Sequence, residues 1–211
     1  MKAESSVQNI LRALAFLVFA ITALHVPILN QPASARTQQG QRKSVTEAFG
    51  TNAQLKISKL RIGSEPREFG EEFDEADDWT SRLSFEIDSL AAKPITFVQI
   101  NLKFPDTLSM GNIMVYTIGV GNRPGASQVV SENPLYLKPG DKMKIDVAND
   151  YNQLEKFIRV RHSMKDIRKV ELEIGFIVFE DGTAWAVGDF LQPDPNNPRR
   201  YINVGRTFPK Q

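Results

Sequence analysis

Hydrophobic and polar residues alternate along most of the chain after residue 54. The alternation is clearest in residues 83–88, 98–104 and 170–178, where every second side chain is apolar. A period of two is typical of β-strands that bury one face. Residues 55–62 fit a first strand with one bulge, because their apolar spacing shifts once. Residues 113–120 form a more continuous apolar run, which predicts a central strand covered on both faces.

Turn-forming residues separate these segments. Residues 138–141 read Lys-Pro-Gly-Asp, with proline second and glycine third, which predicts a type II turn. Residues 180–183 read Glu-Asp-Gly-Thr and predict a hairpin with a two-residue Asp-Gly turn, whose second strand is residues 184–188. Residues 150–158 fit one or two helical turns with Asp150 as N-cap, but they fit a strand equally well, so both alternatives stay open.

The number and spacing of these strands predict the fold. Roughly seven or eight short strands, with turns between them and almost no helix, indicate an all-β, immunoglobulin-like antiparallel sandwich of two sheets. A partly closed barrel is the alternative. We expect the sandwich at residues 54–192, a flexible lead-in at residues 36–53 and a surface tail at residues 193–211.

The first 35 residues have the composition of a secretory signal peptide. A basic start is followed by an uncharged apolar run at residues 13–24 and by the small-residue sequence Ala-Ser-Ala, which ends at Ala35. We expect cleavage between Ala35 and Arg36. A retained signal anchor is the alternative, but the apolar run is short for the roughly 20 residues of a membrane span. The prediction is an exported protein, periplasmic or extracellular, with no stable membrane anchor after cleavage.

Composition excludes several classes of function. The chain has 211 residues, 41% of them hydrophobic, which is ordinary for a folded domain. Cleavage removes two of the 26 basic and one of the 25 acidic residues, which leaves 24 of each. A neutral chain is not drawn to nucleic acid by its bulk charge, and we expect no nucleic-acid partner. The absence of cysteine excludes disulfides, thiolate metal sites, cysteine nucleophiles and a lipid-anchored cysteine.

Residues 178–185 carry one resemblance. They read Val-Phe-Glu-Asp-Gly-Thr-Ala-Trp. This stretch resembles a Val-x-Phe-x-Asp-Gly-Thr-x-Trp hairpin of uncharacterised exported bacterial proteins with an immunoglobulin-like sandwich, with the first spacing shortened by one residue. The resemblance is confined to residues 170–190 and implies the fold, because no assigned function comes with that pattern.

Acidic residues are concentrated between residues 65 and 78. Calcium takes six to eight oxygen ligands, and the loops of sandwich domains often supply them. The loop is therefore a candidate calcium site, with these possible ligands: Glu71, Glu72, Asp74, Asp77 and Asp78. The spacing does not match an EF-hand loop, and a solvated acidic loop without a metal is the alternative.

Aromatic side chains are candidates for a second kind of site. Trp79, Trp185 and Tyr136 would stack against a sugar ring if they lay exposed on a sheet face or loop. The alternative is that Trp185 fills the core beside Phe176 and that Trp79 anchors the acidic loop.

No catalytic residues or resident cofactors are predicted. His162 is the only histidine after residue 35, and no Gly-x-Ser-x-Gly sequence accompanies it. It lies among basic residues between 156 and 169, which offer a surface that the acidic loop of this or another copy could pair with. We expect a non-catalytic binding or interaction module of the cell envelope or extracellular space, with a protein or glycan as partner. A hydrolase of unrecognised type is the alternative, and the oligomeric state is open.

Overall fold

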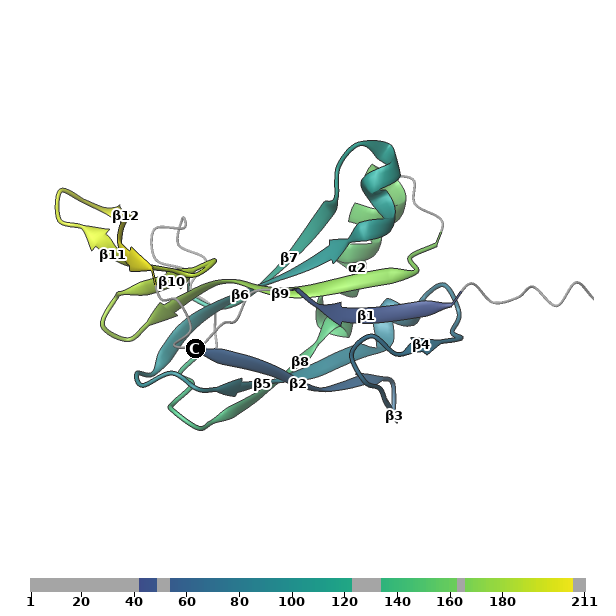
Figure 1. Cartoon of the computed structure of the whole chain (residues 1–211), viewed down its shortest axis with the longest axis horizontal. Helices are drawn as coiled ribbons and strands as arrows, with labels where there is room; N and C mark the ends of the chain where they lie inside the picture. The colour runs from purple at the N-terminus through teal and green to yellow at the C-terminus, as the bar shows by residue number, and fades with distance from the viewer. Residues whose placement is uncertain (1–41, 49–53, 123–133, 163–165, 207–211) are drawn as a thin grey trace, which may run out of the picture. The chain divides into compact units, whose positions relative to one another are not determined.

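The computed structural model describes residues 42–48, 54–122, 134–162 and 166–206, and the predicted signal peptide lies outside them. All described residues belong to one compact unit, Gly40–Gln211. The described residues are mostly β, with twelve strands in two sheets and one short α-helix (Figure 1). The predicted two-sheet sandwich is confirmed, and the barrel alternative is excluded for this unit. The strand count exceeds the prediction because three strands, β3, β4 and β10, have only two or three residues, and because residues 43–47 and 197–206 form strands in the predicted lead-in and tail.

The smaller sheet has four antiparallel strands. Their order is β3 (Glu65–Pro66), β2 (Leu55–Ile62), β5 (Leu83–Ser89) and β8 (Lys142–Asp146). The pairing of β2 with β5 shifts register between Ser58 and Arg61, so the predicted bulge is confirmed. Lys59 lies within the bulge and has a φ of 47°, a left-handed conformation that lets β2 keep its apolar side chains on one face.

The larger sheet is built around β9 (Lys169–Phe179). One side of β9 pairs with β6 (Ile95–Phe104), which in turn pairs with β7 (Met114–Gly121). The other side pairs with two short strands in succession, β1 (Lys43–Glu47) and β10 (Ala184–Ala186). The sheet continues through β4 (Glu72–Phe73) beyond β1, and through β11 (Asp189–Asp194) and β12 (Asn197–Arg206) beyond β10. The β1–β9 pair is parallel, which departs from the purely antiparallel prediction.

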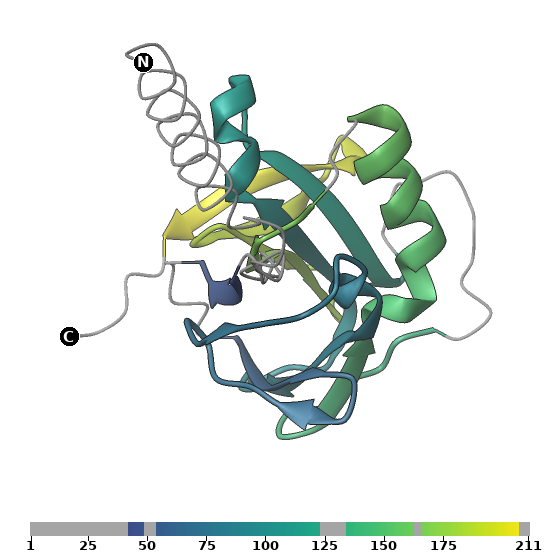
Figure 2. The same cartoon turned by 90° about the vertical axis from the view of Figure 1, so that its right-hand side faces the viewer.

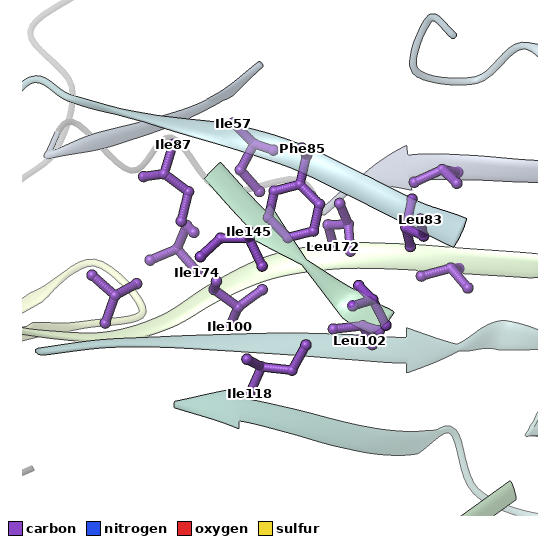
Figure 3. Packing of buried hydrophobic residues seen from close by; sticks show 14 of the residues in the cluster. Ile57, Leu83, Phe85, Ile87, Ile100, Leu102, Ile118, Ile145, Leu172 and Ile174 are labelled. Atoms are coloured by element: carbon purple, nitrogen blue, oxygen red, sulfur yellow. The ribbon is translucent and has the colours of Figure 1, made fainter. Parts of the chain in front are cut away.

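The core lies between the two sheets. Isoleucine, leucine and phenylalanine side chains of β2, β5 and β8 point towards those of β6, β7 and β9 (Figure 3). The labelled side chains are Ile57, Leu83, Phe85, Ile87, Ile100, Leu102, Ile118, Ile145, Leu172 and Ile174. Each is at most 6% exposed. Full burial of one such side chain stabilises the fold by about 1.5–3 kcal/mol, so the alternating pattern is the main determinant of this sandwich.

A helical segment runs without interruption from Val147 to Arg161. It comprises a 3-10 turn, the helix α2 (Tyr151–Glu155) and a π-helical end, with Leu154 and Ile158 buried. The Phe157 and Tyr116 ring centroids lie 5.6 Å apart, so the segment packs against β7 at one side of the sheets (Figure 2). Of the two alternatives, the helix is confirmed. Asp150 occupies the N-cap position of α2 as predicted, but its side chain forms no capping hydrogen bond. The whole segment is capped by Asp146, which accepts a hydrogen bond from the Ala148 N–H at 3.2 Å.

The structure corrects the expectation for residues 113–120. Among the described strands, β7 pairs with β6 alone and lies at an edge, where Ile118 is its one buried residue. Met114, Tyr116 and Val120 are half-buried on the same side as Ile118, whereas Val115 is exposed. A run that is apolar at nearly every position does not reveal which face is covered, because that depends on what packs against the strand.

The structure also differs from the predicted lead-in and tail. Residues 43–47 form β1, in which Lys43, Ser44 and Val45 are buried. Residues 197–206 form β12, which pairs along β11. The hydrophobic pattern did not predict these two strands, because neither has alternating apolar residues. Strand β1 buries a lysine and a serine, and much of β12 is polar.

Two turns show how closely local sequence specifies backbone geometry. The Asp141 N–H donates to the Lys138 carbonyl at 3.0 Å and Gly140 has a φ of 82°, so the predicted type II turn is confirmed. In the β9–β10 hairpin, the Gly182 N–H donates to the Phe179 carbonyl at 3.0 Å and the Phe179 N–H to the Thr183 carbonyl at 2.9 Å. Since Gly182 alone among these residues has a positive φ, the hairpin has a three-residue loop with a glycine bulge, not the two-residue turn.

Candidate functional site

A pocket of about 420 Å³ opens beside the end of β9 and the strand β11, and we call it the β9–β11 pocket. Its apolar lining consists of Ala92, Phe179, Phe190, Leu191 and Val204. Its polar lining consists of Gln54, Lys93, Thr183 and Gln192. The pocket therefore has largely apolar walls with a few hydrogen-bonding groups, the usual composition of a small-ligand site.

Long-range pairing assembles these walls. Phe179 ends β9 and is only 3% exposed, so it is a fixed wall of the pocket. The tight loop after it returns the chain as β10, whose Ala184 pairs with Leu191 of β11. Strand β12 then pairs along β11 and supplies Val204, which is 52% exposed. The pocket thus combines a buried wall with partly open apolar surface.

An ion pair lies at the polar side of the pocket. The Lys93 ammonium donates to the Asp181 carboxylate at 2.5 Å, and the Thr183 hydroxyl donates to the same carboxylate at 2.6 Å. The hydrogen bonds from Lys93 and then from Thr183 lower the pKa of Asp181 from 3.8 to about 2. Asp181 therefore stays ionised at neutral pH and holds both Lys93 and Thr183 in place.

The predicted stacking residues do not form a platform. Trp79 is fully buried: its indole N–H donates to the Ile167 carbonyl at 2.8 Å and its ring packs edge-on against Phe73. Trp185 is 5% exposed and belongs to the hydrophobic core. Tyr136 is 50% exposed, and its hydroxyl donates to Glu180 at 3.0 Å, which raises the pKa of Tyr136. Burial is confirmed for both tryptophans, because a large apolar ring gains most from burial. Trp185 does not lie beside Phe176 as expected, because Phe176 packs against the separate cluster of Phe97, Val178 and Ala184.

Three of the five predicted calcium ligands lie in ion pairs. The carboxylates of Glu71, Glu72 and Asp77 lie 2.9–3.4 Å from basic nitrogens of Arg67, Arg42 and Lys43 respectively. Asp74 and Asp78 are exposed. Within the described ranges, no three histidine, cysteine, aspartate or glutamate side chains form a group that could hold a metal ion.

The basic stretch is partly paired locally. Arg159 contacts Glu155 one helical turn away at 3.2 Å, and Arg168 lies 3.8 Å from Asp106. Among the described residues, no ion pair joins residues 156–162 to the acidic loop, although Asp166 shares the Lys43 ammonium with Asp77. The His162 ring packs against Phe157, with 4.7 Å between centroids. Lys165, which belongs to this stretch, lies outside the described residues.

Sequence reasoning missed the pocket, because no local motif marks it. Phe190 and Leu191 were expected at the end of the sandwich, and Val204 in the surface tail. The one available signal was the return of apolar residues after the proline-rich turn, at Tyr201, Ile202 and Val204. That pattern indicates a strand but does not show which cavity it closes.

Comparison of this chain with protein-family models, curated proteins and solved structures found no match. No family is assigned to it. The resemblance of the 178–185 hairpin to exported bacterial sandwich proteins stays a prediction. Within the part of the chain that the structure describes, no helix is long and apolar enough to cross a membrane.

Proposed function

We propose that this chain is an exported, non-catalytic binding domain that takes the apolar part of a small ligand, or of a partner's side chains, into the β9–β11 pocket. The single observation that carries the proposal is the pocket itself. Its volume of about 420 Å³ falls in the range of ligand sites, roughly 300–1,000 Å³. Phe179, Phe190 and Leu191 provide contacts for an apolar group of the ligand. The side-chain amides of the lining glutamines provide hydrogen bonds for a polar group of the ligand.

The chemistry of the lining favours binding over catalysis. Among the described residues, Lys93 is the one titratable side chain that lines the pocket, and it is paired with Asp181 at 2.5 Å. Acid–base catalysis relies on a group whose pKa lies near the working pH. A lysine held beside a carboxylate that is ionised at neutral pH is instead suited to fix the position of a polar group of the ligand.

Export rests on the sequence of residues 1–35. Expression in a host with a secretory pathway, followed by fractionation and mass measurement of the intact chain, tests this part. We expect a processed chain that begins at Arg36 in the exported fraction. A full-length chain retained in the cytoplasm would contradict export without bearing on the pocket.

The pocket is tested with a fluorescent apolar probe such as N-phenyl-1-naphthylamine, titrated into the chain that begins at Arg36. Ala92 lines the pocket and its side chain is exposed, so Ala92→Trp fills the space without disturbing the core. We expect the probe to bind the wild type and to bind Ala92→Trp about tenfold more weakly, since about 1.4 kcal/mol of apolar contact is lost.

Ala148→Trp is the matched control, because Ala148 is also exposed but lies in the helical segment. It should leave probe binding unchanged. Equal binding by wild type and Ala92→Trp would refute the pocket as the binding site. Native mass spectrometry of the protein recovered from its own envelope then identifies the ligand.

A further inference from the structure

Exposed apolar side chains are concentrated at the turn between β6 and β7. This turn is the 3-10 helix η2 (Pro105–Met110) with the start of β7, and we call residues 105–115 the η2 tip. It lies at the far end of the β6–β7 hairpin, at the top of Figure 1. Its exposed side chains are Leu108 at 61%, Met110 at 59%, Ile113 at 44% and Val115 at 40%.

The η2 tip is held rigidly. Thr107 is fully buried, and its hydroxyl lies 2.7 Å from the Phe104 carbonyl while accepting a hydrogen bond from the Met114 N–H at 2.8 Å. Gly111 ends η2 in a left-handed conformation, with a φ of 104°. The exposed apolar side chains are therefore presented on a fixed turn, and not on a segment that could fold them inwards.

The charges around the η2 tip are asymmetric. Asp106 is its one acidic residue, and the side chain is only 13% exposed. This carboxylate accepts hydrogen bonds from the backbone N–H groups of Arg168 and Lys169, both at 2.9 Å. The same contacts hold these two exposed basic residues beside the tip, where the Arg168 guanidinium also lies 3.8 Å from the Asp106 carboxylate. Because two basic residues accompany one carboxylate, the apolar surface is bordered by a net positive charge.

We propose that the η2 tip inserts reversibly into the surface of an anionic lipid bilayer. Leu108 and Met110 enter the boundary between headgroups and acyl chains, where apolar side chains leave water. Arg168 and Lys169 meet the negatively charged headgroups. Such an attachment is peripheral and needs no membrane-spanning helix.

The charge beside the η2 tip favours a membrane over a second copy of this chain as its binding partner. A symmetric contact between two η2 tips brings Arg168 and Lys169 of one copy close to those of the other, and like charges in contact oppose association. An anionic bilayer presents negative charge to the basic pair and apolar chains to the apolar side chains. The attachment does not depend on the β9–β11 pocket, so either proposal can fail alone.

Vesicle flotation tests the attachment, with the chain that begins at Arg36, since every described element belongs to the unit Gly40–Gln211. The vesicles are phosphatidylcholine alone, or phosphatidylcholine and phosphatidylglycerol in equal parts. We expect binding to the anionic vesicles that weakens with added salt and is absent or much weaker on neutral vesicles. Arg168→Gln with Lys169→Gln should weaken it by about fivefold for each residue changed, because each basic residue near the surface contributes about 1 kcal/mol.

The apolar part is tested by Leu108→Ser combined with Met110→Ser, which should reduce binding by at least about tenfold. The matched control is Leu90→Ser combined with Val187→Ser, at positions that are 58% and 74% exposed elsewhere in the fold. It should bind as the wild type does, and thermal unfolding verifies that every variant is folded.

Two results would overturn the proposal. One is a folded wild type that fails to float with anionic vesicles. The other is flotation that Leu108→Ser with Met110→Ser leaves unchanged. Sedimentation of the lipid-free protein tests the remaining alternative, a dimer. If the wild type does not float but forms a dimer, and Leu108→Ser with Met110→Ser dissociates that dimer, then the η2 tip is a contact between two copies of the chain.

Discussion

Lys43 offers the sharpest test of how this sandwich is held together. Its side chain is only 2% exposed, and its ammonium is shared between Asp166 and Asp77, with 3.3 Å to the latter. Substitution to methionine keeps most of the apolar length but removes the charge. Breaking a buried ion pair costs about 3–5 kcal/mol, because the remaining charge loses its partner. Asp166 is 24% exposed and Asp77 is 63% exposed. Water therefore replaces part of the lost contact, and we expect Lys43→Met to cost about 2 kcal/mol.

Urea unfolding followed by tryptophan fluorescence measures this loss. Trp79 is a local reporter, since its indole bonds the carbonyl of Ile167, the residue after Asp166. A loss of about 2 kcal/mol corresponds to a melting temperature lower by roughly 4–8 °C for a domain of this size. The control is Arg42→Met, which removes the neighbouring Arg42–Glu72 pair, whose side chains are 71% and 57% exposed. An exposed pair contributes about 0–1 kcal/mol.

The losses of unfolding free energy in Lys43→Met and Arg42→Met are compared to decide whether the buried lysine holds β1. If Lys43→Met destabilises no more than Arg42→Met, then β1 is not held by its buried lysine and the reasoning is wrong. Asp166→Asn adds a second check, because its effect and that of Lys43→Met should not be additive if the two side chains act together. Additive effects would mean that each contributes through other contacts.

Three further predictions concern backbone strain and pH. Val187, with a φ of 46° and 74% exposure, precedes Gly188 in the β10–β11 turn, so Val187→Asn should raise the unfolding free energy by about 1 kcal/mol, measured by urea unfolding. A Cβ on Gly121 would lie 2.2 Å from the Thr96 carbonyl oxygen, so Gly121→Ala should lower the melting temperature. The decrease should be larger than that caused by Gly140→Ala, where the positive φ is unfavourable for alanine but no atom lies within 4 Å of the added Cβ. The lowered pKa of Asp181 stabilises the fold above pH 4, and the stabilisation is lost as pH falls from 3.8 towards 2. Asp181→Asn should therefore be less stable at neutral pH, by under about 1 kcal/mol since the carboxylate is 45% exposed, and the difference should shrink on acidification.

Much of the fold follows from sequence alone. The two-residue period in β5, β6 and β9 places apolar side chains on one face of each strand, and burial of that face fixes a two-sheet sandwich. The type II turn at Gly140 follows from local chemistry in the same way, since only one turn geometry suits proline and glycine in those positions.

The remainder depended on tertiary contacts. The buried Lys43 finds its counter-charges in Asp77 and in Asp166, the latter more than a hundred residues away in sequence. One face of strand β7 is exposed because the helical segment and the inter-sheet core cover only its other face, and its apolar sequence is compatible with either arrangement.

Both candidate sites belong to this second category. The β9–β11 pocket joins Gln54 to Val204, and the η2 tip has its basic border because Asp106 bonds the backbone of Arg168. Local sequence determined the central strands β2, β5, β6 and β9, because their apolar periodicity is visible within a few residues, but it did not reveal β1 and β12. Only the tertiary structure decided which side chains meet, because pairing between distant strands sets burial, partner and exposure.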